Sequence, residues 1–501
     1  MSYDIIIVGA GHNGLAAGIV LARAGWKILI LEAQPQPGGT VQTGEVTVPG
    51  FQHDLYATNL NAFAGSAMMQ EFGPELASHG LEFVRASNAF CSIFPDTDLV
   101  GVTTSRDETV SKLARLSQRD AATWSKLFKT YQSISPHVAK ILREPMPSLA
   151  GLRAALACGW TGAKLAFSSS GGFSRRYFEH PKVQAMWAVW SMHLDFAPAM
   201  RGGALYPFMQ CMTVQDKGLR VGKGGAGSLA GALVALFTQY GGELRCGARV
   251  DEIIVENGKA VGVVVAGERM MASRGVIANV TPTALFNRMV KGASAELRRR
   301  VGRYRFGPGT MMIHLALSEL PDWRSEQARN YFYVHVAPSL EAMSLAYRES
   351  SEGILPHEPV LIVAQPTVID PSRAPAGKHV VSIQVRVVPG GIDWTTHKEP
   401  YADRMIELLE RYAPGLRKIT LGRHVISPAD LERANPNLVG GDSLAGSHQL
   451  SQQFLLRPFL GWSRYSTPVR DLYLCGAATW PGAGVGAGSG WILGRMLARG
   501  S

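Results

Sequence analysis

The sequence contains little cysteine and no long apolar run, and both absences exclude classes of protein. Its five cysteines lie far apart in 501 residues and form no C-x-x-C pair, which argues against a disulfide framework or a cysteine-bound zinc ion. No run approaches the ~18–20 apolar residues of a membrane-spanning helix. Met1–Tyr3 carries no basic residue before the strand-length run Asp4–Val8. We therefore expect a cytoplasmic chain without a secretory signal peptide.

Acidic residues are outnumbered by basic ones, and the difference between 50 Lys+Arg and 39 Asp+Glu is a net charge of +11. Such an excess is either a solvated basic surface or an attraction to anionic partners. The densest basic run, residues 296–305, has no interleaved aromatic residues of the kind that stack on single-stranded nucleic acid. We therefore expect no nucleic-acid partner, and a peripheral membrane contact stays open.

Glycine is abundant, with 55 residues, but it follows no three-residue period, which excludes collagen. A chain with 46% hydrophobic and 18% charged residues can bury a large interior, so global disorder is excluded as well. The H-E-x-x-H, Ser-His-Asp and P-loop lysine motifs are missing, and we predict no metal site. The glycines therefore need local explanations.

The first such explanation is a βαβ unit at the N-terminus. The β-branched run Asp4–Val8 is followed at once by Gly9-Ala10-Gly11-His12-Asn13-Gly14, a helical stretch to about Ala24, and a second strand, Lys27–Leu31, that ends on Glu32. Gly9 permits a tight turn, Gly11 lets the backbone approach a pyrophosphate, and Gly14 lets the helix pack closely on the strand. The helix N-terminus attracts phosphates, and Glu32 is placed to bind ribose hydroxyls.

Gly38-Gly39 follows directly after this unit. A second glycine pair is not part of the minimal NAD fingerprint, and the segment resembles the glutathione-reductase-like group of FAD enzymes. Farther along, Gly222–Ser228 opens a helix to about Tyr240, with Ser228 as a possible cap. We reject a second nucleotide site there, because no buried strand directly precedes it and no acidic residue follows at the right distance.

Two more strand patterns and a glycine-dense segment complete the cofactor region. Residues 248–255 and 260–265 form a predicted hairpin around Asn257-Gly258, and Val276–Asn279 is a predicted buried strand. Near the C-terminus a strand ends at Gly476, and the segment up to Gly490 opens the final helix. Such bare backbone can approach a planar ring or a phosphate.

Together these motifs resemble the phytoene desaturase and carotenoid oxidoreductase family, in its branch of phytoene-dehydrogenase-like FAD-dependent oxidoreductases. Pro49-Gly50-Phe51 with His53-Asp54 carries the resemblance as well, and supporting stretches are Phe306–Gly309, Leu317–Pro321 and Asp370-Pro371. The resemblance spans essentially the whole chain. The sequence departs from the family at Trp480, where the family often has histidine. A proton-transfer role at this position is therefore in doubt, and we expect the tryptophan ring either to stack beside the flavin or to shape a smaller pocket.

The motifs and the resemblance together predict an α/β fold with a Rossmann-like, glutathione-reductase-type FAD-binding domain made of residues 1–60, 215–290 and 440–501. A substrate domain of mixed sheet and helices, residues 61–214 and 291–439, is inserted into it. The predicted FAD contacts come from the turn, the two glycine segments and two strand positions that only the resemblance implies, Val250 and Asn279. They are Gly9, Gly11, His12, Asn13, Gly14, Glu32, Ala33, Gly38, Gly39, Thr40, Val250, Asn279, Gly476, Ala477, Trp480, Pro481, Gly484 and Val485.

Flavin desaturation needs a hydride acceptor, which is N5 of FAD, and a group that takes one substrate proton. The side chains that we predict for the proton are His448, Arg457 and His193, and a structural role is the alternative for each. The predicted function is removal of hydride from C–C or C–N bonds of a hydrophobic small molecule, with oxygen or a quinone as electron acceptor. The alternatives are a redox-neutral isomerase, a saturase that uses reduced FAD, and a non-catalytic FAD-fold binding or chaperone-like protein.

Overall fold

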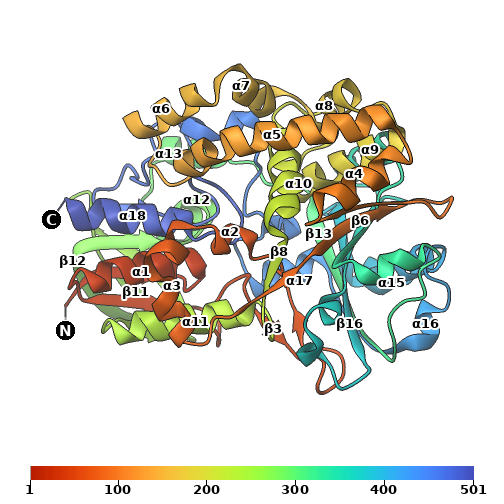
Figure 1. Ribbon diagram of the computed structural model, residues 1–501. Coiled ribbons are helices and arrows are strands. Elements are labelled where there is room, and N and C mark those ends of the chain that lie inside the picture. Colours follow the sequence, from red (N-terminus) through yellow and green to blue (C-terminus); the bar gives the residue numbers. More distant parts are fainter. Residues whose placement is uncertain (1, 501) are drawn as a thin grey trace.

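Two seven-stranded sheets organise the protein, and the structure, a computed structural model, describes residues 2–500. In Figure 1 the first sheet lies at the left with α1 and α18 in front of it, the second lies at the right, and a layer of helices crosses the top. No helix within residues 2–500 is long and apolar enough to cross a membrane.

The first sheet has a parallel centre and an antiparallel edge. Its order is β10-β11-β12-β1-β2-β9, and β18 pairs with β12. The strands are β1 Tyr3–Val8, β2 Ile28–Leu31, β9 Glu243–Arg245, β10 Val250–Glu256, β11 Lys259–Val265, β12 Glu268–Ala278 and β18 Leu472–Leu474. β1 pairs in parallel with β2 and β12, and it is buried on both faces because helices and chain cover both sides. The β10–β11 turn has positive φ at Asn257 (50°) and Gly258 (71°), which confirms the predicted hairpin.

One face of this sheet is covered by α1 (His12–Arg23), α3 (Ala67–Ser78), α11 (Gly227–Gln239) and α18 (Gly488–Arg499). Glycines bring these helices unusually close. A Cβ added to Gly494 of α18 would lie 2.9 Å from Cβ of Val20 in α1. The other face packs against η2 (Leu285–Met289), which directly follows α12 (Pro282–Ala284), and against α13 (Ala295–Val301).

The second sheet is mixed, in the order β17-β13-β16-β15-β14-β6-β7. Its strands are β6 Asn88–Ile93, β7 Leu99–Thr103, β13 Gly309–Leu317, β14 Tyr333–Val336, β15 Val360–Ala364, β16 His379–Val388 and β17 Thr420–Ile426. Only β14 and β6 pair in parallel among these strands of the described chain. Side chains alternate between its faces: Met311, Ile313 and Leu315 of β13 enter one core, and Met312 enters another.

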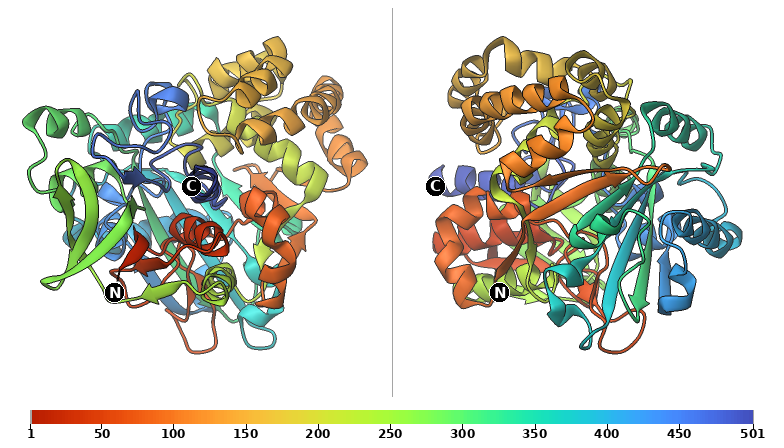
Figure 2. Two further views of the ribbon diagram at one scale, coloured as in Figure 1. Left: turned by 90° about the vertical axis from the view of Figure 1, so that its left-hand side faces the viewer. Right: turned by 45° about the vertical axis from the view of Figure 1, so that its right-hand side comes forward.

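Helices cover both faces of the second sheet, as the right-hand view of Figure 2 shows. One face packs against α5 (Gln118–Ile141), α8 (Ser170–Tyr177), α9 (Pro181–Ala188), η1 (Val189–Leu194), α10 (Leu205–Lys217) and α14 (Leu340–Ser351). The other packs against α15 (Trp394–Glu410) and α16 (Leu416–Ile419). The remaining elements are β3 Thr43–Gly44, β4 His53–Asp54, β5 Phe83–Ala86, β8 Leu219–Gly222, α2 Asn61–Ala64, α4 Arg106–Ala114, α6 Leu149–Ala157, α7 Gly159–Phe167, α17 Pro428–Ala434 and the 3₁₀ turns η3 Glu326–Asn330, η4 Pro366–Val368, η5 Pro371–Arg373, η6 Val439–Gly441, η7 Leu450–Gln452 and η8 Phe454–Leu456.

The strands of each sheet lie within the ranges predicted for its domain, but two boundaries differ. The predicted boundary places residues 61–81 in the substrate domain, yet Phe63, Met68 and Phe72 pack in the core with α1 and α11. Residues 291–301 likewise pack under the first sheet through Val301. In both places the apolar face of a helix extends the core of the first sheet beyond the glycine motifs on which the predicted boundaries are based.

Candidate functional site

The fingerprint turn between β1 and α1 is closely packed at its three glycines. Gly9 has φ +96°, and a Cβ on Gly14 would overlap the carbonyl oxygen of Gly9. Nδ2 of Asn279, just past the end of β12, donates to the Gly9 carbonyl at 3.2 Å and would lie 3.1 Å from a Cβ on Gly11. The positive φ of Gly9 fits the predicted tight turn, and the close contacts of Gly14 fit its predicted packing role, whereas approach of a pyrophosphate to Gly11 stays a prediction.

Glu32 is buried at the end of the second strand and faces the same turn. Its carboxylate accepts the backbone N–H of Ala10 at 2.7 Å and of Gln34 at 2.9 Å. Each oxygen keeps a further acceptor position that a ribose hydroxyl could use. The glycine pair also reaches the turn, because Gly38 N–H donates to the Ala10 carbonyl at 2.9 Å.

The N-terminus of α1 has free N–H groups for an anion. Gly11 is its N-cap, and no side chain of the described residues caps it. His12 in the first turn is held neutral, because burial lowers its pKa to about 4, and its Nε2 lies 3.0 Å from Nδ2 of Asn13. An uncapped helix N-terminus beside bare backbone fits a pyrophosphate.

The glycine-dense C-terminal segment connects β18 to α18 beside this turn. Ser489 in α18 accepts the N–H of Gly476 at 2.9 Å and shares a hydrogen bond with the Thr479 hydroxyl at 2.7 Å. A Cβ on Gly476 would overlap Oδ1 of Asn279, whereas a Cβ on Gly484 would meet no heavy atom within 4 Å. The segment is therefore fixed at its start and open at Gly484.

These residues fit a dinucleotide cofactor, because glycine backbone that side chains cannot cover surrounds the uncapped N-terminus of α1. The structure brings the predicted fingerprint, Glu32, the glycine pair and Asn279 together. Val250 is buried at the start of β10, close to Glu32, whose carbonyl accepts Ala248 N–H at 2.8 Å. Ala33 is exposed just past β2, and Thr40 follows the glycine pair.

The Trp480 side chain packs within the protein. Its ring is 2% exposed, tilts against Phe454 at 5.9 Å, and donates its indole N–H to the Glu144 carbonyl at 2.9 Å. Its own carbonyl accepts the Tyr465 hydroxyl at 3.0 Å. The side chain therefore anchors the C-terminal segment to the chain just after α5, and a contact with the flavin stays a prediction.

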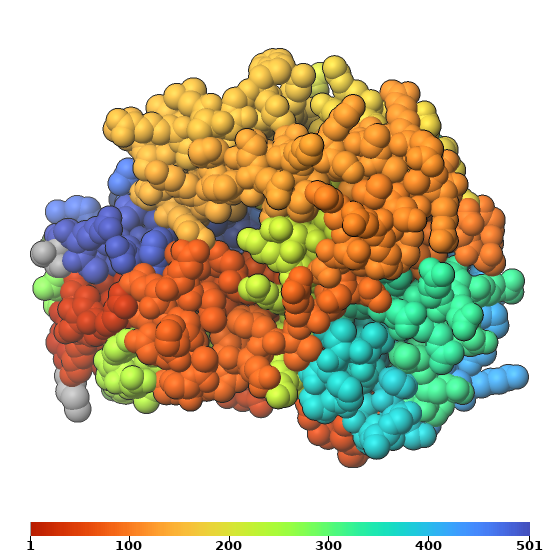
Figure 3. All heavy atoms as spheres, in the orientation of Figure 1, coloured from red at the N-terminus to blue at the C-terminus, as the bar shows by residue number. Residues whose placement is uncertain are grey.

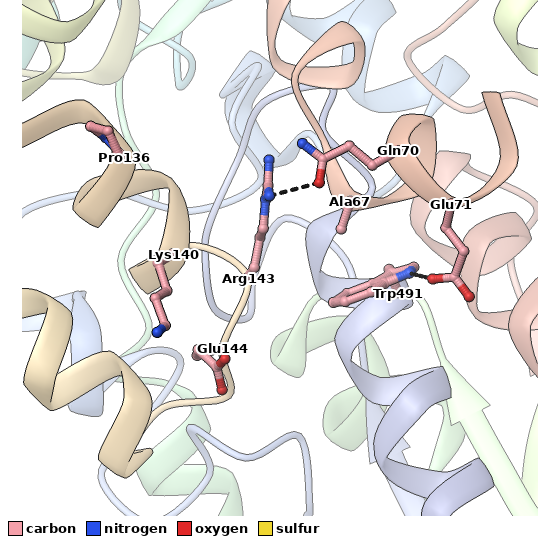
Figure 4. Close-up of a pocket in the computed structure, with 8 residues that line it drawn as sticks. All are labelled: Ala67, Gln70, Glu71, Pro136, Lys140, Arg143, Glu144 and Trp491. Carbon is pink, nitrogen blue, oxygen red and sulfur yellow. Dashed lines mark hydrogen bonds between the residues drawn. The ribbon is translucent and has the colours of Figure 1, made fainter. Parts of the chain in front are cut away.

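A cavity of about 500 Å³ lies next to this anchor, between α3, α5 and α18. Figure 4 shows that its walls are largely polar and charged, with Arg143 bonded to Gln70 and Trp491 to Glu71. His448, Arg457 and His193 are not among its lining residues. The cavity is therefore separate from the residues predicted for chemistry.

The helix start at residues 222–228 differs from the prediction in two ways. A short buried strand, β8, does directly precede it, and Ser228 is not its cap. Instead, the backbone N–H of Ala226 donates to the Asp54 carboxylate at 2.7 Å, and that of Gly227 donates to the Thr43 hydroxyl at 2.9 Å. The predicted absence of a preceding strand is therefore wrong, but side chains occupy these N–H groups, which disfavours a second nucleotide site in addition to the missing acidic residue.

His448 is buried against the C-terminal segment. Its Nε2 accepts the Ala483 N–H at 2.9 Å, so its proton is on Nδ1, which has no partner among the described residues. Burial and the nearby Arg457 charge lower the pKa of His448 well below its usual range. The ring is therefore neutral and holds Ala483 in place.

Arg457 has a structural geometry that does not suit the predicted role in proton transfer. It is 0% exposed, and its guanidinium donates to the carbonyls of Ala477 (2.6 Å), Ser447 (2.9 Å) and Gln452 (3.3 Å). A guanidinium that is always protonated cannot accept a proton. The prediction is corrected accordingly: Arg457 ties residues 446–452 to the chain just after β18.

His193 is half-buried in η1 and lies in an aromatic cluster, stacked on Trp190 at 4.5 Å and edge-on to His335 at 5.5 Å. Its Nε2 is buried without a partner among the described residues, as are both ring nitrogens of His335. Burial and the charges of His335 and Arg386 lower the pKa of His193 well below its usual range. No hydrogen bond joins His193 to His448 within residues 2–500, but their near neighbours in the sequence, Asp195 and Ser447, are hydrogen-bonded to each other.

Asp195 makes this connection, and the sequence predicted no role for it. Its backbone is left-handed (φ 64°), and it is 3% exposed. It accepts the Tyr347 hydroxyl at 2.8 Å and the Ser447 hydroxyl at 2.8 Å, and no cation of residues 2–500 forms an ion pair with it. Burial raises the pKa of Asp195 to about 7. Its proximity to His193 in the sequence is the only signal that could have indicated it.

Comparisons with known proteins agree with this cofactor site. A model of the family described as flavin containing amine oxidoreductase matches residues 14–487. The chain is similar to pyridine nucleotide-disulfide oxidoreductase domain-containing protein 2 of Rattus norvegicus, with 26% identity over 97% of this chain and 92% of that one. Identity is 25% to a limonene dehydrogenase subunit of Castellaniella defragrans, over 99% and 94% of the two chains. It is 24% to the neurosporene-forming phytoene desaturase of Cereibacter sphaeroides, over 96% and 91%.

The fold also matches solved structures. An oxidoreductase from Methanosarcina mazei superposes with a TM-score of 0.62 at 17% identity, over 99% of both chains. The predicted resemblance to the carotenoid oxidoreductases and the predicted α/β fold are therefore confirmed. With its fingerprint turn, glycine pair and C-terminal segment assembled around one dinucleotide site, the chain belongs to the flavin-containing amine oxidoreductase family and is an FAD-dependent oxidoreductase.

Proposed function

We propose that this enzyme is a dehydrogenase that removes hydride from a C–C or C–N bond of a hydrophobic small molecule, with oxygen or a quinone as electron acceptor. FAD, held by the fingerprint turn, Glu32, Asn279 and the C-terminal segment, supplies the hydride acceptor when bound. Oxygen or a quinone is favoured over NAD as acceptor, because the second glycine-rich helix start in the described chain has its N–H groups occupied. Relatives named as a limonene dehydrogenase subunit and a phytoene desaturase support dehydrogenation.

The observation that carries the proposal is the apolar junction between the C-terminal segment and the second sheet. Ala477 of that segment and Tyr56 pack against Met312, Leu438 and Ala445 from the other side of the junction. A substrate that contacts these side chains exchanges water for apolar surface, which favours a hydrophobic molecule.

Asp195 is the group that we propose for the substrate proton. Its two hydroxyl partners can bond either form of the carboxyl group. A pKa raised by burial to about 7 lets it accept a proton near neutral pH. His448 is then a positioning residue that fixes the segment through Ala483, and His193 borders the same region.

Anaerobic mixing of the FAD-loaded enzyme with a panel of lipophilic alkenes, cyclic ketones and amines tests the proposal. A substrate should bleach the absorbance at about 450 nm that is typical of an oxidised flavin. Turnover only with pre-reduced flavin, without net bleaching, would assign an isomerase or saturase instead. Binding without any turnover would favour the non-catalytic alternative.

Asp195→Asn keeps the shape and both hydroxyl contacts, so it should retain FAD yet slow bleaching by about a hundredfold or more. The difference in rate between the wild type and this variant should be larger at pH 8 than at pH 6, since the wild-type carboxyl group is ionised at the higher pH. His448→Ala should retain FAD and change the spectrum of the bound flavin. Unchanged bleaching in Asp195→Asn would remove Asp195 from the mechanism while leaving the dehydrogenase proposal standing.

A further inference from the structure

The helical layer exposes apolar side chains where a surface helix normally exposes polar ones. On α6 and α7 the exposed fractions are 64% for Leu149, 57% for Leu152, 71% for Leu156, 75% for Trp160 and 59% for Phe167. Leu149, Leu152 and Leu156 follow the spacing of one helix face, while Gly151 and Ala154 face inward. The two helices therefore turn an apolar face outward, at the upper left edge of Figure 3.

The charged side chains on α6 and α7 are all positive. Residues 145–178 contain no aspartate or glutamate, but they contain Arg153, Lys164, Arg175 and Arg176. The Lys164 ammonium lies 5.7 Å from the Trp160 ring centre. An exposed tryptophan next to a lysine, on a helix with an apolar face, is the arrangement of segments that lie in a membrane interface.

A basic cavity opens beside the apolar face. It has a volume of about 440 Å³ between α5, α7 and α8, and four cations line it: Arg119, Lys126, Lys164 and Arg176. None of its lining residues is acidic. Arg119 has one acidic partner outside the cavity, Glu179, at 3.5 Å. The cavity therefore presents positive charge next to Trp160, through Thr161 and Lys164 of α7.

A neighbouring segment extends the same surface. Arg464 donates to the Pro147 carbonyl at 2.9 Å, just before α6, and the segment 454–464 exposes Leu455, Leu456 and Leu460. The Leu460 carbonyl is bonded by Arg300 of the basic run in α13. In the left view of Figure 2 the α13 region, this segment and the α6–α7 pair follow one another along the upper edge.

From these observations we propose that the α6–α7 pair is a docking surface for an anionic phospholipid bilayer. Leu152, Leu156 and Trp160 enter the acyl boundary, and a lipid phosphate binds in the cavity lined by Lys126 and Lys164. A protein partner would need acidic groups that match the four cations around an apolar patch. An anionic bilayer has both features, because its phosphates carry negative charge and its acyl chains are apolar. The basic run that has no role in the cofactor site then adds long-range attraction.

Sedimentation of the FAD-loaded enzyme with vesicles tests the proposal. Binding is expected to vesicles with about 30 mol % phosphatidylglycerol, to be weak with phosphatidylcholine alone, and to fall as salt rises. The variant Leu152→Ser/Leu156→Ser/Trp160→Ser should bind at least about tenfold less. The matched control Leu345→Ser/Ile354→Ser/Leu421→Ser removes side chains of similar exposure (44%, 52% and 50%) elsewhere and should bind like the wild type. Retained flavin in both variants shows that they are folded.

Two further measurements separate the proposal from other occupants. Brominated acyl chains should quench tryptophan fluorescence in the wild type, and Trp160→Phe should lose most of that quenching. Lys126→Glu/Lys164→Glu should abolish the preference for anionic vesicles. Equal binding of the apolar variant and the wild type would overturn the proposal. The proposal would also be overturned if the wild type is a dimer that binds no vesicles and the apolar variant is a monomer, because the apolar face would then join two copies of the chain.

Discussion

Replacing Gly14 by alanine tests whether the cofactor site depends on close backbone contact. The added Cβ would overlap the Gly9 carbonyl oxygen and lie 3.0 Å from Nδ2 of Asn279. A backbone oxygen cannot move away by changing a rotamer, so the turn between β1 and α1 must open. That movement would carry the free N–H groups of the α1 N-terminus away from the pyrophosphate position.

The expected magnitude follows from two opposing effects. Overpacking at a close contact costs about 1–3 kcal/mol, while exchanging glycine for alanine within a helix contributes about 1 kcal/mol of stability. We therefore expect Gly14→Ala to lose up to about 2 kcal/mol of unfolding free energy in the absence of FAD. The dissociation constant of FAD should rise at least about tenfold, which corresponds to about 1.4 kcal/mol.

Titration of FAD into apoprotein, followed by flavin fluorescence, measures the affinity, and thermal unfolding measures the stability. Gly231→Ala is the matched control, because Gly231 is exposed within α11 and its Cβ would meet no heavy atom within 4 Å. That variant should bind FAD normally and unfold at a slightly higher temperature. If Gly14→Ala behaves in the same way, the reasoning about close backbone contact is refuted.

Two further predictions concern buried charged groups. Arg457→Met should lose about 3 kcal/mol or more of unfolding free energy, since several buried carbonyls lose their donor. The control Arg423→Met breaks only exposed ion pairs with Glu399 and Asp403 and should lose about 1 kcal/mol or less. Equal losses in urea titrations of the two variants would contradict the structural role of Arg457. The pKa of Asp195 is raised from 3.8 to about 7 by burial, so its contribution to stability is present below pH 3.8 and is lost as pH rises through 7. Asp195→Asn should therefore gain stability relative to the wild type across that interval, and a difference that stays constant with pH would refute the shift.

The cofactor side of the site was predictable because close backbone contact selects glycine wherever it occurs. The turn at Gly9–Gly14, the pair Gly38-Gly39 and the segment after Gly476 each carry that signal, and the structure brings all three to the surroundings of Asn279. The hairpin at Asn257-Gly258 was predictable for a related reason, since a two-residue turn needs positive φ. In each case a local backbone requirement restricts the residue type.

The proton-handling side was not predictable, because its properties arise from contacts between distant segments. Nothing around residue 195 indicates that Tyr347 and Ser447 will supply its hydrogen bonds, or that burial will raise its pKa. Arg457 shows the converse: an arginine near a glycine-rich segment suggested chemistry, yet carbonyls from three places in the chain take its donors. Burial and partners depend on the tertiary fold, which composition and spacing do not reveal.

One buried charge cluster joins distant parts of the chain beside the cofactor site. Arg373 of η5 is 0% exposed and bonds Asp54 at 3.2 Å and Asp370 at 3.1 Å. Asp54 also caps α11 through Ala226, and Asp370 accepts Gly224 N–H at 2.8 Å. The two Asp-containing motifs, which lie far apart in the sequence, therefore meet at the same helix start. Because a buried arginine needs both carboxylates to offset its desolvation, this contact fixes η5 against the start of α11 and against β4.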